Sequence, residues 1–348
     1  MQNLSPSTPC AQSAISQLQS RSRQPERPPW DIERFARERA ITLGMSLETS
    51  TREVYSSAAR SYLNFCKIHK FPIEPTPDNL CNFVLWLCAS DPRVSPSTAS
   101  GYLSGICSVL EPFYPDIRSA RNSNLVSKTL AGLRKRFSVP ARRKRALSIE
   151  DIKYVYGLYQ ISNSLDDLLF AAMFAAGFHA LHRLGELCWA DEPQRRNYRR
   201  IIMRSSVSRT TSSFSYLLPA HKADMSYSGN VIRIESRWDT INPIPILNQY
   251  LSARDSRFPY HCELWLRSDG VPPTKSWFRK RLATIFPSDI SGHSLRSGGA
   301  TALAIHGVPD NLIQKIGRWS SDAWQIYVRV HPVVLAGLVT DTQRPERT

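Results

Sequence analysis

A histidine, an arginine and a tyrosine lie in the segment HSLRSGGATALAIHGVPDNLIQKIGRWSSDAWQIYVRV, near the carboxyl end of the chain. His293 and Arg296 are three residues apart, which places them on one face if the segment is helical. Tyr327 closes the segment, and its hydroxyl is a candidate nucleophile. The segment therefore predicts one of two things. It is either the second half of an active site or a DNA-reading helix-turn-helix, with Gly307 at the turn and Pro309 opening the next helix.

Two further cations precede this segment. Arg183 follows an apolar stretch, and an arginine at the edge of a core needs a partner. Glu186 is able to form a structural ion pair with it, so a phosphate-binding role for Arg183 depends on other cations converging there. Lys222 is expected at a hairpin, where a lysine is usually solvated but is also able to enter a groove as a proton donor. Gly298 and Gly299 lack side chains beside Arg296, which allows backbone or ligand to approach closely.

Motifs of several other chemistries are absent from the sequence. No glycine is followed by lysine, so there is no P-loop, and neither GxGxxG nor GxSxG occurs. The seven cysteines form no CxxC pair, and their odd number indicates reduced thiols. His179, His182 and His221 crowd the motifs but complete no metal site, so structural or DNA-contact roles are expected for them. We expect neither a metal nor a nucleotide cofactor.

The chain is strongly basic, with 45 Lys and Arg against 29 Asp and Glu and a formal charge of +16. This excess favours a polyanionic partner, with nucleic acid first. The charge is densest over residues 134–145, where Pro140 prevents a continuous helix. We interpret this segment as a linker that is either a solvated hinge, a strap along a phosphate backbone or a nuclear-localisation patch. Its basic residues are Arg134, Lys135, Arg136, Arg142, Arg143, Lys144 and Arg145.

The first part of the chain is predicted to be a helical bundle. Residues 1–28 are rich in Ser, Gln and Pro and are expected to form a disordered tail. Residues 29–137 show helical periodicity in four stretches, namely 46–70, 76–90, 95–113 and 124–137. Helices joined by short loops make a compact all-α domain.

The second part, residues 148–348 after the linker 138–147, is predicted to mix helices and strands. Ser148 is the expected N-cap of its first helix. The apolar helix expected over 168–181 is too short to span a membrane. Further helices are expected over 243–254, 274–285, 297–306 and 310–318, and strands over 200–209, 214–220 and 230–235. Helices around a small antiparallel sheet make an α+β domain.

The motifs in their order along the chain resemble the tyrosine recombinase (phage integrase) family. They are R-x-G-E-L from Arg183, a hairpin lysine, H-x-x-R, and G-R-W-S-S with a tyrosine nine residues past Arg318. The resemblance covers about residues 30–335. It implies a core-binding (SAM-like) domain for the bundle and the family's catalytic fold for the α+β domain. The GRWSSDAW segment and the basic helical domain are similar to recombinases of eukaryotic mobile elements (Crypton/DIRS-like).

The resemblance also implies a reaction. Tyr327 would attack a DNA phosphodiester, giving a 3′-phosphotyrosine and a free 5′-hydroxyl, and a second 5′-hydroxyl would reverse the step on a new strand. Arg183 and Arg296 would bind the phosphate oxygens. His293 would assist as a base towards the tyrosine, and Lys222 would protonate the leaving oxygen. Since the arginines stabilise the charge, no metal is required.

One position departs from the family pattern. The family usually has His or Trp nine residues before the tyrosine, whereas this chain has Arg318 there with Trp319 next to it. Either Arg318 supplies the donor, or a shift of one residue brings Trp319 into that role. Glu186 matches the acidic residue after the first arginine and is expected to support the site rather than react.

The partners expected from the resemblance are double-stranded DNA and further copies of the chain, as a tetramer on paired DNA sites. The apolar segment 331–341 is predicted either to pack on its own domain or to dock on a neighbouring subunit. No signal peptide or membrane span is expected, which predicts a nuclear protein if the source is eukaryotic and otherwise a cytoplasmic one, associated with the nucleoid. The alternatives are a domesticated, inactive recombinase that acts as a DNA-binding regulator and a topoisomerase-like swivel.

Overall fold

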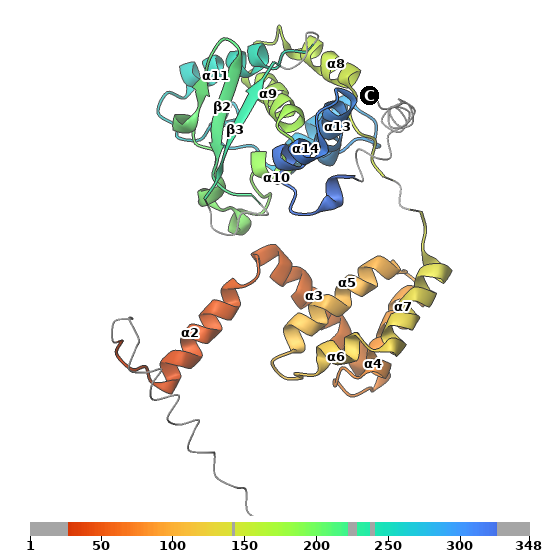
Figure 1. Cartoon of the computed structure of the whole chain (residues 1–348). Coiled ribbons are helices and arrows are strands. Elements are labelled where there is room, and N and C mark those ends of the chain that lie inside the picture. The colour runs from red at the N-terminus through yellow and green to blue at the C-terminus, as the bar shows by residue number, and fades with distance from the viewer. Residues whose placement is uncertain (1–26, 141–142, 222–227, 237–240, 326–348) are drawn as a thin grey trace, which may run out of the picture. The chain divides into compact units, whose positions relative to one another are not determined.

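The computed structural model of the chain describes residues 27–140, 143–221, 228–236 and 241–325 (Figure 1). The chain divides into two compact units, with the boundary between Val139 and Pro140. Residues 1–26 of the predicted tail and the apolar segment 331–341 lie outside the described residues.

The first unit is all-helical over its described residues. Its helices are α2 (Ile32–Met45), α3 (Thr49–His69), α4 (Pro77–Ala89), α5 (Pro96–Leu110), α6 (Ile117–Arg121) and α7 (Asn124–Phe137). The four predicted helices are confirmed to within a few residues at their ends. The starts of α4, α5 and α7 are fixed by side chains of Thr76, Ser95 and Ser123, each of which accepts a hydrogen bond from the backbone N–H three residues on.

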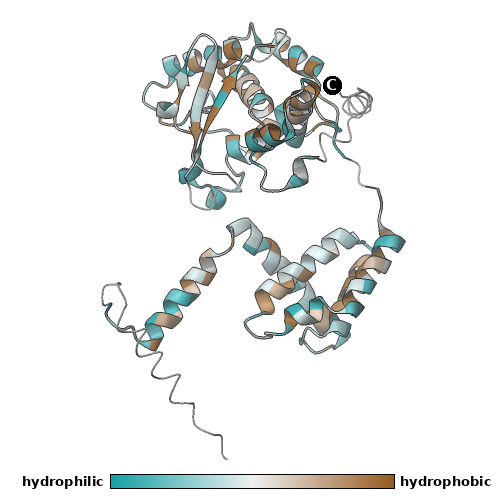
Figure 2. Ribbon diagram, viewed as in Figure 1, coloured by the Kyte–Doolittle hydropathy of each residue, from teal (hydrophilic) through white to brown (hydrophobic). Residues whose placement is uncertain are grey.

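The core of the first unit forms where α3, α4, α5 and α7 meet. Tyr62 and Phe65 of α3 pack with Phe83 of α4, and all three side chains are buried. Helix α2 differs, because none of its side chains that the structure describes is buried, and Figure 2 shows hydrophilic and hydrophobic residues alternating along it. Phe35 of this helix and Trp30, which precedes it, form an exposed aromatic pair with ring centroids 5.3 Å apart.

The second unit combines helices with a small sheet. Its α-helices are α8 (Ile149–Tyr159), α9 (Leu165–His179), α10 (Leu184–Leu187), α11 (Ile244–Arg257), α12 (Lys275–Ile285), α13 (Gly292–Ile305) and α14 (Asp310–Gly317). Strands β1 (Ser208–Arg209), β2 (Ser213–Leu218) and β3 (Asn230–Glu235) form an antiparallel sheet in that order. The expected α+β class is therefore confirmed.

Helix α9 is the centre of this unit, between α11 and α13 in Figure 1. Its side chains are buried on every face, as an all-round apolar sequence requires. Among the described residues, no helix is long and apolar enough to cross a membrane. The sheet covers the core with Phe214, Tyr216 and Leu218 of β2, which are the alternate residues that the sequence pattern predicted.

The strand predicted over 200–209 is wrong, because only Ser208 and Arg209 pair with β2. The preceding residues form a short 3-10 turn, η3 (Arg204–Ser206), whose first residue is held by contacts outside the sheet. The Arg204 guanidinium donates to the Asp255 carboxylate at 2.7 Å, and its backbone N–H donates to the carbonyl of Cys262 at 2.7 Å. Tertiary contacts thus override the strand-like alternation of this segment.

The helix predicted over 297–306 begins earlier, at Gly292, so His293 and Arg296 both lie on α13. Gly298 and Gly299 allow this helix to lie against backbone. A Cβ atom at Gly298 would be 2.3 Å from the carbonyl oxygen of Leu147, and one at Gly299 would be 2.1 Å from that of Phe178. The close approach predicted at these glycines is therefore made by the protein's own backbone.

Gly299→Ala is expected to lower the free energy of unfolding by about 3 kcal/mol or more, because the methyl group meets a backbone atom that has no room to move. The matched control is Gly157→Ala in α8, where nothing lies within 4 Å of an added Cβ atom. There alanine should stabilise the protein by about 0.4–1 kcal/mol. Denaturant unfolding of both variants measures the difference, and equal effects would contradict the packing described for α13.

Candidate active site

The candidate site is built on the turn that follows α9. Helix α9 ends at His179, and Leu181 then adopts a left-handed backbone conformation with φ of 52°. The backbone N–H of His182 still donates to the carbonyl of Gly177 at 3.1 Å, so the turn is fixed to the end of the helix. Arg183 follows as the residue that opens the short helix α10. This geometry places Arg183 at the edge of the core with 29% of its side chain exposed.

The carboxylate of Glu186 is the hub of the site. Its Oε1 accepts from Nη1 of Arg183 at 3.0 Å, and its Oε2 accepts from the Arg183 backbone N–H at 3.1 Å and from Nη2 of Arg318 at 3.0 Å. The side chain is only 7% exposed. Burial alone would raise the pKa of this carboxyl. The hydrogen bond to His182 and the charge of Arg318 outweigh burial and hold the pKa well below its usual range. Glu186 is therefore ionised and bridges two arginines.

A buried chain of hydrogen bonds supports this carboxylate from behind. His182 Nδ1 lies 2.9 Å from Glu186 Oε2, and His182 Nε2 lies 2.6 Å from the hydroxyl of Tyr216 on β2. Burial lowers the pKa of His182 from 6.5 to about 4, so the imidazole is neutral near pH 7. A neutral ring with a carboxylate at Nδ1 carries its proton there and accepts from the tyrosine hydroxyl at Nε2. The sheet thus fixes the orientation of Glu186 through two uncharged side chains.

His182 makes the stability of the protein depend on pH. Its pKa is near 6.5 in the unfolded chain and about 4 in the folded one, so the unfolded state binds more protons between these values. The stabilisation is complete above pH 6.5 and is lost as the pH falls to 4, by an amount on the order of 3 kcal/mol. Thermal unfolding of the wild type and of His182→Gln across this window measures the effect. The assignment would be contradicted if stability depended on pH as steeply in His182→Gln as in the wild type. It would also be contradicted if the exposed control His261→Gln lost this pH dependence to the same extent.

Arg318 is enclosed in the same network. It ends α14 in a left-handed conformation with φ of 55°, which turns its side chain towards α9. Besides Glu186, its guanidinium donates to the carbonyls of Ala180 and Leu181, both at 3.3 Å, and only 6% of the side chain is exposed. The guanidinium of Arg318 is thus hydrogen-bonded mainly to a carboxylate and backbone carbonyls within the protein.

Arg296 reaches the same turn from α13. Its Nη1 donates to the carbonyl of Leu181 at 2.7 Å, its Nη2 donates to the carbonyl of Gly317, and the residue is 1% exposed. The guanidinium lies 4.1 Å from the centroid of the Trp319 ring, a cation–π contact. Leu181 therefore connects Arg296 and Arg318 through one carbonyl, and Trp319 covers Arg296.

His293 lies one helical turn before Arg296, at the surface of the unit. Partial burial lowers its pKa, and the positive charges of Arg296 and Arg183 lower it further. The imidazole is therefore neutral near pH 7 and able to accept a proton.

The structure thus brings together five of the predicted site residues, which are Arg183, Glu186, His293, Arg296 and Arg318, with Trp319 against them. Lys222 and Tyr327 lie outside the described residues, so their positions stay predictions. Sequence reasoning missed the supporting roles of Leu181 and Tyr216, whereas the structural role that was one of the two expected for His182 is observed. No sequence pattern predicts a positive φ at a leucine such as Leu181. The position of His182, directly before the R-x-G-E-L motif, is a signal in the sequence for a residue that supports the site. No group of three or more His, Cys, Asp or Glu that could hold a metal ion occurs in the described ranges.

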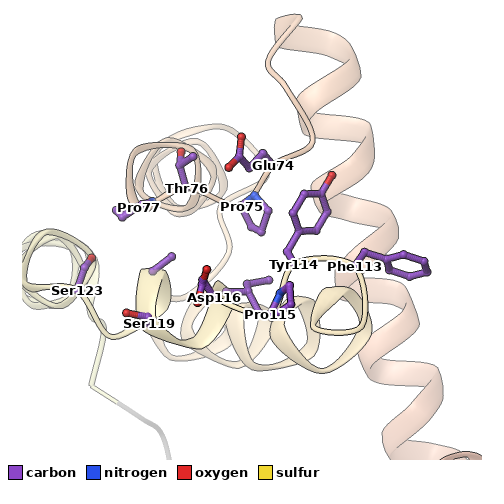
Figure 3. A pocket seen from close by; sticks show the side chains of 12 residues that line it. Glu74, Pro75, Thr76, Pro77, Phe113, Tyr114, Pro115, Asp116, Ser119 and Ser123 are labelled. Atoms are coloured by element: carbon purple, nitrogen blue, oxygen red, sulfur yellow. The ribbon is translucent and has the colours of Figure 1, made fainter. Parts of the chain in front are cut away.

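A separate cavity of about 470 Å³ lies in the first unit, near the start of α4 and the segment between α5 and α6 (Figure 3). Phe113 and Tyr114 line it together with the carboxylates of Glu74 and Asp116, and no Lys, Arg or His lines it. A cavity that offers only negative charge repels a phosphodiester. The cavity is therefore unsuited to the chemistry of the arginine cluster.

Comparisons with known proteins were made at the levels of sequence and structure. No protein-family model and no curated protein sequence matches the chain. Solved structures do match. The Tn1549 transposon integrase in complex with circular intermediate DNA has a TM-score of 0.51 at 13% identity, over 97% of this chain and 100% of that chain. A lambda integrase dimer bound to a COC′ core site has a TM-score of 0.51 at 14% identity, over 84% of this chain and 93% of that chain.

A third similar structure is the XerH site-specific recombinase bound to palindromic difH substrate in a post-cleavage complex. Its TM-score is 0.52 at 14% identity, over 77% of this chain and 73% of that chain. The chain has the tyrosine recombinase fold. The expected fold is thereby confirmed, whereas identities this low leave the activity and the mobile-element type as predictions.

The basic residues predicted to contact DNA are divided between the two units of this tyrosine recombinase fold. Arg134, Lys135 and Arg136 are exposed in the last turn of α7. Lys144 and Arg145 are tied to the second unit, since Lys144 donates to the carbonyl of Ser288 and Arg145 pairs with Asp151 at 2.6 Å and Asp289 at 3.5 Å. Arg143 is exposed, and Arg142 lies outside the described residues. The charge of Arg145 is thus partly neutralised, whereas that of the α7 cluster faces solvent.

Proposed function

We propose that the protein is a site-specific DNA recombinase or integrase that breaks and rejoins DNA through a 3′-phosphotyrosine on Tyr327. The observation that carries this proposal is the convergence of Arg183 and Arg296 on one turn. Arg296 binds the carbonyl of Leu181, two residues before Arg183, and both arginines lower the pKa of His293. Two permanent cations beside a neutral imidazole suit the binding of a phosphodiester and the acceptance of a proton from a nucleophile.

The reaction would proceed by two displacements at phosphorus. In the first, the Tyr327 oxygen forms a bond to the phosphorus, its proton passes to His293, and the bond to the 5′-oxygen breaks. That oxygen takes a proton from Lys222 and leaves as a hydroxyl. In the second, a 5′-hydroxyl attacks the phosphotyrosine and releases the tyrosine. The number of phosphodiester bonds is unchanged, so no external energy source is needed.

The arginines have different tasks in this proposal. Arg183, with an exposed edge, meets the phosphate first, and Arg296 is pre-organised by two backbone carbonyls and Trp319. Arg318 positions Glu186, while Trp319 lies beside the phosphate and fills the place that the family usually gives to His or Trp. The network around Arg318 supports this division, because its guanidinium is already bound by one carboxylate and by backbone carbonyls.

The partners proposed are duplex DNA and further copies of this chain. The similar integrase and recombinase structures are complexes with DNA, and one is a dimer at its core site. A tetramer on paired sites, a eukaryotic mobile element as the source and a nuclear location remain part of the proposal. The exposed basic turn of α7 favours binding dominated by phosphates, which weakens as salt rises.

A covalent-trapping assay tests the proposal. Wild-type and Tyr327→Phe protein are incubated with pooled duplexes, including DNA that flanks the native gene, with nicks that let the cleaved end diffuse away. The wild type should give a protein–DNA adduct on denaturing gels, and Tyr327→Phe should bind DNA equally but give none. An adduct that persists in Tyr327→Phe would refute the assigned nucleophile.

The second candidate function is a DNA-binding regulator derived from an inactive recombinase. The enclosure of Arg296 and the arginine at position 318 favour it. A helix-turn-helix reader is less well supported. Gly307 does form the turn between α13 and α14, with φ of 73°, but α13 is largely buried and Lys315 is the single basic residue on α14. Salt-sensitive DNA binding by a wild type that forms no adduct would favour the regulator.

A further inference from the structure

The connection between α10 and the sheet carries an arginine-rich surface that the proposed chemistry does not use. It contains two short 3-10 turns, η1 (Pro193–Arg195) and η2 (Tyr198–Arg200). Arg195, Arg199 and Arg200 are exposed, Arg196 is half-buried, and Tyr198 is 71% exposed. We propose that this arginine surface, residues 189–200, binds the phosphate backbone of duplex DNA beside the site of strand cleavage. This inference rests on the proposed function.

The arginine surface is built on a fixed framework. The backbone of Trp189 donates to the carbonyl of Pro273 at 2.9 Å and accepts from the N–H of Lys275 at 3.1 Å. The Trp189 ring supports two members of the surface, since the Arg196 guanidinium lies 5.1 Å from its centroid and the Tyr198 ring 5.3 Å away at 76°. Arg196 Nε also donates to the carbonyl of Ala190 at 3.3 Å. The Arg196 guanidinium is therefore held in place before any ligand binds, which reduces the entropic cost of binding at this position.

The charge of this surface is not balanced by its own carboxylates. The Asp191 carboxylate accepts from the backbone N–H of Ser276 at 2.9 Å, at the start of α12. Glu192 pairs with Arg195 at 3.5 Å, in a contact that is about half exposed and hence contributes little. Within the described ranges, Arg196 and Arg199 have no carboxylate partner. Exposed cations beside an exposed aromatic ring are typical of surfaces that bind nucleic-acid backbones.

The arginine surface adjoins the candidate active site. Trp189, at the start of this surface, follows Arg183 in the chain after only α10, which is roughly 6 Å long, and Cys188. Lys275 lies between the two, because a Cβ atom at Gly185 would be 3.1 Å from Lys275 Cε, while the Lys275 backbone binds Trp189. A DNA strand whose phosphate is held at Arg183 would therefore meet Lys275 and then the arginine surface.

Contact with phosphates, rather than with bases, is expected here. Reading base edges in the major groove needs an element such as a helix that enters it, and η1 and η2 are single short turns. Arginines on such turns reach the backbone and set the register of the protein on the duplex. The effect on affinity should therefore be the same for every DNA sequence.

The test measures how DNA binding by the full chain depends on salt. The variant Arg195→Gln/Arg199→Gln/Arg200→Gln leaves Arg196 on its tryptophan. It should bind a duplex of random sequence with a salt slope smaller by about 0.9 for each phosphate that is no longer neutralised, up to about 2.7 for three. Arg199→Gln alone should lower the slope by about 0.9. The control Lys153→Gln/Arg233→Gln/Arg257→Gln removes the same number of charges from other exposed positions and should keep the wild-type slope.

The outcomes separate this inference from the proposed function. Wild-type slopes in both arginine-surface variants, or an equal drop in the control, would overturn the role of this surface while DNA binding and adduct formation stand. Absence of salt-dependent DNA binding by the wild type would overturn both proposals. Matching melting temperatures of the variants and the wild type establish that the change in slope is not due to unfolding.

Discussion

Glu186→Gln is expected to be among the most destabilising substitutions in the second unit, at about 3–5 kcal/mol in the free energy of unfolding. The change keeps the size of the side chain but removes its charge. Arg318 would then be a buried cation without a carboxylate, and Arg183 would be deprived of its ion pair. The amide also places an N–H₂ group where Glu186 accepts hydrogen bonds at both oxygens.

Denaturant unfolding of Glu186→Gln measures this effect. The control is Glu150→Gln in α8, which breaks an exposed pair with Lys153 and should change stability by less than about 0.5 kcal/mol. If Glu186→Gln were as stable as this control, Glu186 would not be the hub described here.

Arg183→Gln is expected to reduce the rate of adduct formation by about 10²–10³-fold. Of the two arginines assigned to the phosphate, Arg183 is the one with a sizeable exposed edge, so its replacement removes charge stabilisation without opening the core. The rate is measured from covalent trapping under single-turnover conditions. DNA affinity should fall much less, because one cation among many contributes to binding.

Arg183→Lys separates charge from geometry. A lysine keeps the positive charge but lacks the planar fork that binds two phosphate oxygens, so its rate should lie between those of Arg183→Gln and the wild type. If Arg183→Gln formed the adduct at the wild-type rate, Arg183 would serve only as the ion-pair partner of Glu186. That structural role is the alternative to phosphate binding that the sequence left open.

Much of the fold follows from local patterns. The apolar run of α9 predicts a buried central helix, and the alternation at Phe214, Tyr216 and Leu218 predicts the inward face of β2. Both succeed because burial of a continuous apolar face dominates over other contacts. The alternation in RIIMRSSVSR fails because Arg204 is bound by Asp255, far away in the sequence. No local pattern reports such a contact.

In the candidate site, too, some features were predictable from the sequence and others depend on distant contacts. The convergence of Arg183, His293 and Arg296 was expected from the family resemblance that their order along the chain carries. The means of convergence was not predictable, because it depends on the carbonyl of Leu181 and on left-handed backbone at Leu181 and Arg318. Glycine is the usual residue in the left-handed conformation, so a leucine and an arginine at these positions do not predict it. The hydrogen bond between Tyr216 and His182 likewise joins segments that only the tertiary fold brings together.

The most direct test of the central claim is to locate the covalent bond between protein and DNA. Wild-type adduct is digested with nuclease and trypsin, and the peptides are analysed by mass spectrometry. Cleavage after Arg318 and Arg329 releases WSSDAWQIYVR, in which Tyr327 is the single tyrosine. We expect the residual nucleotide on Tyr327 of this peptide, joined through a 3′-phosphate. A nucleotide on Ser320, Ser321 or any other peptide would contradict the account.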